Sequence, residues 1–244
     1  MKKLICAAAS ALCATVFAIE SENIVGYQKI KIKGGSYQLF TTTFQDVQTS
    51  TYDIQNVKVV NADGSDYTLN NKVKIQKVTA SGNYGTTYNY RQSKGGWCSA
   101  ATYVGTGVVM LQDGEGVALY NGDANDLYLS VSGQVNLTPV STTVPAASYQ
   151  IIGNLTPVTV DIQSVKPYIG DTECTNNNKV KIQKVLENGN YGPTYNYRKA
   201  KGGWCSAATY IGTDVVYLEP GECVAVYNGE SEAITLNFPC PISE

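Results

Sequence analysis

A short run of tyrosine, asparagine and arginine occurs twice in the chain and has the side chains that bind sugars. The run reads Tyr-Asn-Tyr-Arg at both places. Tyrosine rings stack on the faces of sugar rings, and amide and guanidinium groups donate hydrogen bonds to hydroxyls. The sequence therefore predicts a candidate ligand-binding strip made of Tyr88, Asn89, Tyr90, Arg91, Tyr195, Asn196, Tyr197 and Arg198.

The same rings also suit the interior of a sheet. Tyr88 and Tyr90 lie two residues apart, so on a strand they share one face. Trp97 and Trp204 follow the two runs at equal distances, and tryptophan and tyrosine commonly pack across strands as anchors of a core. A sugar-binding strip and a packed core both remain open interpretations of this pattern.

Residues with catalytic chemistry are scarce. The chain has no histidine, which excludes Ser-His and Cys-His nucleophilic sites and every metal site that uses imidazole. Two pairs of acids recur in the chain, Asp53 with Asp161 and Glu115 with Glu222. Glycoside hydrolysis needs two carboxylates at a set separation, but both glutamates directly follow a turn glycine, where a capping or solvated carboxylate is common. We therefore expect no enzyme activity, no catalytic residues and no cofactor.

Two acidic clusters, residues 61–66 and 123–126, place oxygen atoms at nearby positions, as calcium prefers. Neither cluster recurs in the second half of the chain. Asn, Asp and Gly are also ordinary turn residues, so we predict turns here and no metal site.

The cysteines that follow residue 18 are odd in number. In an oxidising compartment they allow up to two disulfides with one thiol left over, or one disulfide between molecules. Alternation along the last strand argues against a bond between Cys223 and Cys240, and the connectivity stays open. The five residues are Cys98, Cys174, Cys205, Cys223 and Cys240.

The strip belongs to a long internal repeat. Residues 71–122 align without a gap with residues 178–229, and 39 of these 52 positions are identical. Shorter matches precede them, Ser-Tyr-Gln at Ser36 and Ser148 and Asp-Ile-Gln at Asp53 and Asp161. Copies of this length are domain-sized. The sequence predicts a signal peptide over residues 1–18, one β domain over 19–136 and a second over 137–244, with a Thr-, Pro- and Ser-rich linker at 136–147.

Strands must position these residues. Val73 and Ile75 alternate with polar neighbours and should face a core, and the alternation slips at Lys77 and Val78, which predicts a bulge or a strand end. Turn residues recur every 8 to 12 positions or so, and residues 19–244 have no convincing helical periodicity. The expected fold is all-β, with two tandem homologous β-sandwich or small β-barrel domains.

The first residues indicate export. Lys2 and Lys3 precede an apolar stretch over residues 4–17, and Ala18 offers a small side chain at a cleavage position. No later segment has the roughly 20 apolar residues of a membrane span. The net charge of −2 gives no electrostatic reason to bind nucleic acid or an anionic membrane. We expect a secreted protein located in the periplasm, at the cell surface or outside the cell.

Three further motifs carry a resemblance. They are Asn-Ile-Val-Gly-Tyr at residues 23–27, Val-Pro-Ala-Ala-Ser-Tyr-Gln-Ile-Ile at 144–152, and Pro-Gly-Glu followed by Val-Ala-Val-Tyr-Asn-Gly at 220–229. Together they resemble secreted tandem β-domain proteins of Verrucomicrobia- and Lentisphaerae-type bacteria, over almost the whole chain after the leader. The resemblance implies an exported β-rich module and brings no assigned activity or functional residue with it.

These observations favour a secreted, non-catalytic structural or interaction module of the cell envelope or extracellular space. The alternative is a glycan-binding module that uses the duplicated Tyr/Asn/Arg strip. The expected partners are a polysaccharide or another surface protein, and self-association is compatible with both hypotheses.

Overall fold

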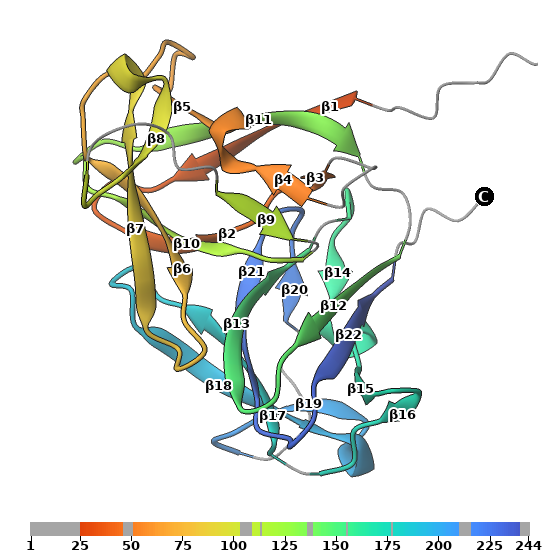
Figure 1. Cartoon of the computed structure of the whole chain (residues 1–244). Helices are drawn as coiled ribbons and strands as arrows, with labels where there is room; N and C mark the ends of the chain where they lie inside the picture. Colours follow the sequence, from red (N-terminus) through yellow and green to blue (C-terminus); the bar gives the residue numbers. More distant parts are fainter. Residues whose placement is uncertain are drawn as a thin grey trace, which may run out of the picture.

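The computed structural model describes residues 25–45, 51–102, 109–112, 114–135, 139–154, 156–176, 178–209 and 216–239. Within these ranges the regular structure is strand, interrupted only by single-turn 3-10 helices (Figure 1). The predicted all-β class is therefore confirmed. No helix in the described ranges is both long and apolar enough to cross a bilayer.

The first repeat contains two antiparallel sheets and a small strand pair. In one sheet β11 lies between β1 and β3 and also pairs with β5, the second sheet has the order β2-β10-β6-β7-β8, and β4 pairs with β9. The strands are β1 (Val25–Ile32), β2 (Tyr37–Phe40), β3 (Phe44–Gln45), β4 (Thr51–Asp53), β5 (Lys58–Val60), β6 (Val73–Val78), β7 (Tyr84–Arg91), β8 (Gly96–Ser99), β9 (Met110–Gln112), β10 (Val117–Asn121) and β11 (Leu127–Val135). The 3-10 turns are η1 (Ile54–Asn56) and η2 (Gln92–Lys94).

The second repeat has corresponding sheets. Their orders are β12-β22-β15-β16 and β13-β21-β17-β18-β19, and β14 pairs with β20. The strands are β12 (Val140–Val144), β13 (Ser148–Gly153), β14 (Val160–Asp161), β15 (Pro167–Ile169), β16 (Thr172–Glu173), β17 (Val180–Val185), β18 (Tyr191–Arg198), β19 (Gly203–Ser206), β20 (Tyr217–Leu218), β21 (Cys223–Asn228) and β22 (Ile234–Phe238). The 3-10 turns are η3 (Ile162–Ser164) and η4 (Lys199–Lys201).

The alternation in the sequence is realised in β6. Val73 and Ile75 are buried in the core of the first repeat. The pairing of β6 with β7 shifts register between Gln76 and Val78, and β17 shifts at the matching place. Of the two alternatives predicted at Lys77 and Val78, a bulge or a strand end, the structure has the irregular register of a bulge, and β6 continues to Val78.

The predicted linker over residues 136–147 is wrong in its central part. Residues 140–144 form β12, which pairs with β22 along its whole length. Val140, Thr142 and Val144 are buried, while Ser141 and Thr143 are exposed. Threonine and valine are β-branched and favour a strand. The alternation of apolar and polar positions therefore indicates the strand, whereas the linker-like composition of the segment does not.

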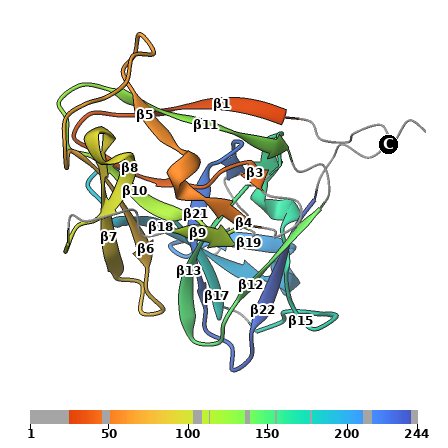
Figure 2. The same ribbon diagram turned by 45° about the horizontal axis from the view of Figure 1, so that its top comes forward.

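Each repeat has its own hydrophobic core, and a third cluster joins them. Buried residues of 32–131 form one core and those of 140–238 a second. The β1–β11 pair runs along the top of the molecule and the β12–β22 pair lies at the lower right in both views (Figures 1 and 2). The third cluster lies between the five-stranded sheets, which therefore carry both the predicted strip and the contact between repeats.

Candidate functional site: the interface between the repeats

The second tyrosine of each predicted run lies in a core. Tyr90 is 5% exposed and Tyr197 is 2% exposed. Their rings meet Trp97 and Trp204 edge to face, with centroids 5.2 and 5.1 Å apart. A buried ring offers no face to a sugar, so these two residues follow the packed-core interpretation of the motif.

The other residues of the strip lie on both faces of β7 and β18. The half-buried Tyr88 and Tyr195 pack against the same cores as Tyr90 and Tyr197. Asn89 and Asn196 point to the opposite face and are buried there. The arginines bind neighbouring turns, since Arg91 Nε donates to Asn71 Oδ1 at 2.8 Å and Arg198 Nε donates to Asn178 Oδ1 at 3.0 Å.

The strip is therefore not one open surface. Ligand contact stays a prediction for the partly exposed members, Tyr88, Arg91, Tyr195 and Arg198.

The recurring glutamates close turns. Glu115 pairs with Lys77 at 2.9 Å and accepts a hydrogen bond from the backbone of Gln112. Glu222 pairs with Lys184 at 2.7 Å and accepts one from the backbone of Glu219. Each carboxylate thus holds the turn before β10 or β21, as expected for a capping residue.

The recurring aspartates cap 3-10 turns. Asp53 accepts a hydrogen bond from the backbone of Gln55 at the start of η1, and Asp161 accepts one from Gln163 at the start of η3, both at 2.9 Å. A side-chain oxygen that accepts an early backbone N–H of a helical turn stabilises it. All four duplicated acids therefore have local structural partners.

The cysteines in the described ranges form no disulfide with one another. Cys98, Cys174, Cys205 and Cys223 are buried free thiols. Cys98 donates to the carbonyl oxygen of Gly96 and Cys205 to that of Gly203. Cys240 lies outside the described residues. The expectation of disulfides is thus unmet for these four residues, which fill space as small apolar side chains.

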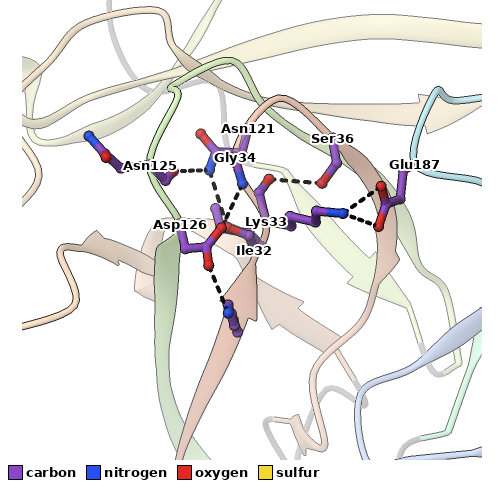
Figure 3. A network of polar contacts seen from close by, with 9 residues as sticks. Ile32, Lys33, Gly34, Ser36, Asn121, Asn125, Asp126 and Glu187 are labelled. Carbon is purple, nitrogen blue, oxygen red and sulfur yellow. Dashed lines mark hydrogen bonds and ion pairs between the residues drawn. The ribbon is translucent and has the colours of Figure 1, made fainter.

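The second acidic cluster ties two turns together (Figure 3). Asp126 accepts a hydrogen bond from the backbone of Gly34 and pairs with Lys31. The Asn121 amide donates to the carbonyl oxygens of Ile32 and Asn125. These polar groups join the β1–β2 turn to the β10–β11 turn, which agrees with the prediction of a turn.

The first cluster is also a turn. Asp63 accepts hydrogen bonds from the backbone and the hydroxyl of Ser65, and the amide of Asn61 donates to the Ser65 hydroxyl. The described residues contain no group of three or more Cys, Asp or Glu side chains placed to hold a metal ion.

Three tyrosines of each repeat form a cluster beside the contact between the repeats. Tyr37 stacks on Tyr84 with centroids 5.6 Å apart and also contacts Tyr120 at 4.5 Å. In the second repeat, Tyr149 makes the corresponding contacts, at 5.9 Å with Tyr191 and at 4.7 Å with Tyr227. We call these two groups of three the tyrosine triads.

Each triad is bonded to the other repeat. The Tyr84 hydroxyl donates to the carbonyl oxygen of Gly189 at 2.5 Å, and the Tyr191 hydroxyl donates to that of Gly82 at 2.7 Å. Both glycines have positive φ, 84° at Gly82 and 85° at Gly189. A Cβ at either glycine would lie 3.0 Å from a ring of the opposite triad. Glycine is therefore favoured here both by conformation and by the close approach of a ring.

Backbone hydrogen bonds between the repeats also occur in matched pairs. The Tyr37 N–H donates to the carbonyl oxygen of Glu187, and the Tyr149 N–H donates to that of Ala80. At the other end of β2 and β13, the Thr41 N–H donates to the carbonyl oxygen of Gly221, and the Gly153 N–H donates to that of Gly114.

Exchanging the repeats converts one member of each pair into the other. The contact is consequently isologous, like that of a two-fold symmetric dimer.

The centre of the contact is apolar. Leu39, Ala118, Ile151, Cys223 and Ala225 are buried together between the two five-stranded sheets. Beside them lies a groove of about 340 Å³ that both repeats line.

Charged groups at the rim of this groove have polar partners within the second repeat. Lys184 and Glu222 form an ion pair, and Glu219 accepts a hydrogen bond from the Thr159 hydroxyl.

Between the repeats, Lys33 pairs with Glu187 at 2.7 Å and the Gln28 side-chain amide donates to the carbonyl oxygen of Pro220, so both polar and apolar contacts join the two repeats.

The repeat motif contains a sequence signal for this interface. Val117-Ala118-Leu119 is a continuous apolar run, and continuous runs are typical of strands buried on both faces. The structure buries all three residues. Gly82, Tyr84, Gly189 and Tyr191 also recur at equal spacing in the repeats.

Searches of the chain against protein-family models, curated proteins and solved structures give no match.

Proposed function

We propose that the protein is a non-catalytic structural or interaction module that is exported to the cell envelope or the extracellular space. In this proposal, residues 19–136 and 137–244 are two β domains that act as one rigid unit. The isologous interface between the repeats carries the proposal. Two triads, matched backbone hydrogen bonds and a shared apolar centre restrain the repeats against each other.

The use of the duplicated polar residues supports the absence of catalysis. A catalytic pair needs carboxylates that face a common substrate space. Glu115 and Glu222 instead each hold a turn and pair with a lysine of their own repeat. The thiols of Cys98 and Cys205 are buried, so they lack the access that a nucleophile needs.

The proposal is tested with the purified chain lacking residues 1–18. We expect no turnover in a panel of chromogenic glycosides and esters, and a compact particle in small-angle X-ray scattering whose dimensions fit the packed repeats. Turnover that is lost in Glu115→Gln or Glu222→Gln, with the circular dichroism spectrum unchanged, would overturn the non-catalytic assignment. A scattering profile of two independently moving bodies would contradict the rigid unit.

A second candidate function is glycan binding. One observation favours it: Tyr88 with Arg91 and Tyr195 with Arg198 offer partly exposed rings and guanidinium groups in two copies. Two copies of a weak site gain avidity on a polymer.

A polysaccharide pull-down separates this candidate from the first. Binding that Tyr88→Ala with Tyr195→Ala abolishes, without loss of fold, would support it. Retention of binding in that double variant would exclude the strip as the sugar site. Tyr27→Ala is the control, because Tyr27 is 66% exposed and lies outside the strip.

A further inference from the structure

Near the two-fold axis, the repeats meet through equivalent positions that carry different residues. Gly116 corresponds to Cys223, and the pairing of β2 and β13 with their neighbours makes Thr41 the counterpart of Gly153. In each of these two pairs, one repeat contributes a glycine and the other contributes a side chain.

The glycines make room for those side chains. A Cβ built on Gly116 would lie 2.8 Å from Cys223 Sγ and 2.6 Å from Ile151 Cγ2. A Cβ built on Gly153 would overlap Thr41 Cγ2 and lie 2.6 Å from Cys223 Sγ. Neither glycine has a positive φ, so close packing, and not backbone conformation, explains the absence of a side chain at both positions.

In the two contacts, the side chain that fills the space comes from different repeats. Cys223 of the second repeat, 3% exposed, fills the space left by Gly116 of the first. Thr41 of the first repeat, 1% exposed, fills the space left by Gly153 of the second. Each repeat therefore has one protruding side chain and one recess, and both fit only the other kind of repeat.

We infer that this surface is heterotypic: it fits the first repeat to the second and rejects the pairing of like repeats. Two first repeats would place Thr41 against Thr41 and leave a void between two copies of Gly116. Two second repeats would crowd two Cys223 side chains and leave a void at Gly153. Overpacking and cavities both destabilise a core, and such penalties against a wrong partner create specificity.

The partner of this surface is the unlike repeat, within one chain or from a second copy of it. Self-association through the surface then proceeds only by exchange of unlike repeats between chains.

A double-substitution cycle in the whole chain tests the fit. Cys223→Gly leaves a cavity and Gly116→Cys overpacks the centre, so each lowers the melting temperature, by roughly 4 °C or more. Combining the two substitutions moves the thiol side chain from the second repeat to the first. We expect the double variant to melt at least about 3 °C above the value that additive losses give, because residues in contact are coupled. The melts are recorded in a reducing buffer.

Cys205→Gly provides the matched control, since it removes the same side chain from a buried site of the second repeat outside the shared cluster. The loss of melting temperature caused by Cys205→Gly should add to the loss caused by Gly116→Cys. Additivity in the Cys223 cycle as well would overturn the inference. Should Gly116→Cys not fold, Thr41→Gly with Gly153→Ala gives the same cycle at the second pair, with the same two outcomes.

Oxidation of the Gly116→Cys variant gives a second readout. With oxidised glutathione, the thiols at 116 and 223 lose two protons and two electrons to form a disulfide, and glutathione disulfide becomes two thiols. We expect a bond within one chain, seen as a linked peptide in mass spectrometry. Bonds between chains joining 223 to 223 would show that like repeats pair and would contradict the proposal.

Discussion

Individual tyrosines combine two functions in this molecule, which accounts for a composition of 18 tyrosines against 4 phenylalanines. Tyr84 packs its ring in a triad and bonds its hydroxyl to the other repeat. Tyr67 is buried and donates to Asp123 at 2.7 Å, and Tyr52 donates to the carbonyl oxygen of Ser132. A phenylalanine at these positions would bury similar area but leave the acceptor unpaired.

The hydroxyls of the triads should contribute to stability. We expect Tyr84→Phe with Tyr191→Phe to lower the free energy of unfolding by about 1–3 kcal/mol in total, because each variant leaves a part-buried carbonyl oxygen unbonded. Urea denaturation followed by circular dichroism measures the change. Tyr27→Phe is the control, since that side chain is 66% exposed. Equal stability of the control and the double variant would contradict the role given to these bonds.

One pair of polar residues differs between the repeats, and the difference suggests a stabilising substitution. Tyr67 and Asp123 of the first repeat correspond to Cys174 and Glu230 of the second. Glu230 Oε1 is buried and has no hydrogen-bond partner in the described structure. Burial, and next the charge of Glu230, raise the pKa of the Cys174 thiol to about 11.

Cys174→Tyr with Glu230→Asp transplants the bonded pair into the second repeat. We expect the free energy of unfolding to rise by about 1 kcal/mol, since a buried acceptor gains a donor. Thermal denaturation measures this. The single variant Cys174→Tyr keeps the longer acid and should gain less. A double variant that is less stable than the natural chain would show that the second repeat cannot accommodate the pair.

At the scale of elements, the tip of the β6–β7 hairpin contacts the second repeat, and the tip of the β17–β18 hairpin contacts the first. Their tips contain Gly82 and Gly189, against which the rings of Tyr149 and Tyr37 pack. The hairpin tip is therefore a point of contact as well as a turn.

Substitution at these tips should cost more than substitution in an open turn. Gly82→Ala and Gly189→Ala each introduce a Cβ at positive φ and 3.0 Å from a tyrosine ring. Gly64 has φ of 88° with nothing near its Cβ position, so Gly64→Ala isolates the cost of conformation. We expect each tip variant to lose about 1–3 kcal/mol beyond this control in chemical denaturation. A loss of unfolding free energy equal to that of Gly64→Ala would contradict this prediction, because the tyrosine rings would then move aside at no energetic cost.

Local pattern predicted the elements well because strand periodicity depends on near neighbours. Alternation identified β6 and its bulge, and the same pattern would have identified β12, which composition misassigned to a linker. The apolar run at residues 117–119 indicates a strand buried on both faces, but local pattern does not identify the surface that covers the second face. Tyr37 meets the backbone of Gly189 across more than a hundred residues, and alternation states which residues share a face but not what covers that face. The strip around Tyr90 was ambiguous for the same reason.

At the scale of the whole molecule, buried phenols make stability depend on alkaline pH. The pKa of Tyr191 is raised to about 12, mainly by burial and to a smaller extent by the charges of Tyr84 and Tyr149. Burial also raises the pKa of Tyr52 to about 12. Unfolded tyrosine ionises near pH 10. The folded state holds these protons more tightly, so their contribution is complete below about pH 10 and is lost as the pH rises towards 12.

We therefore expect the free energy of unfolding to fall between about pH 10 and 12, with tyrosinate absorbance rising together with loss of the circular dichroism signal. Tyr191→Phe and Tyr52→Phe remove two of the responsible groups and should flatten this dependence. Tyr27→Phe serves as the exposed control. An unchanged slope in the Tyr191 and Tyr52 variants would contradict the assignment of the pH dependence to these rings.

The isologous contact between the repeats has a consequence for a protein at low concentration. Two separate chains joined by such a surface would come apart on dilution, because their association depends on concentration. Here both surfaces belong to one polypeptide, so their meeting is unimolecular and the closed form persists however few copies surround it. Duplication within one chain thus preserves a dimer-like architecture in a dilute medium where a true dimer would dissociate.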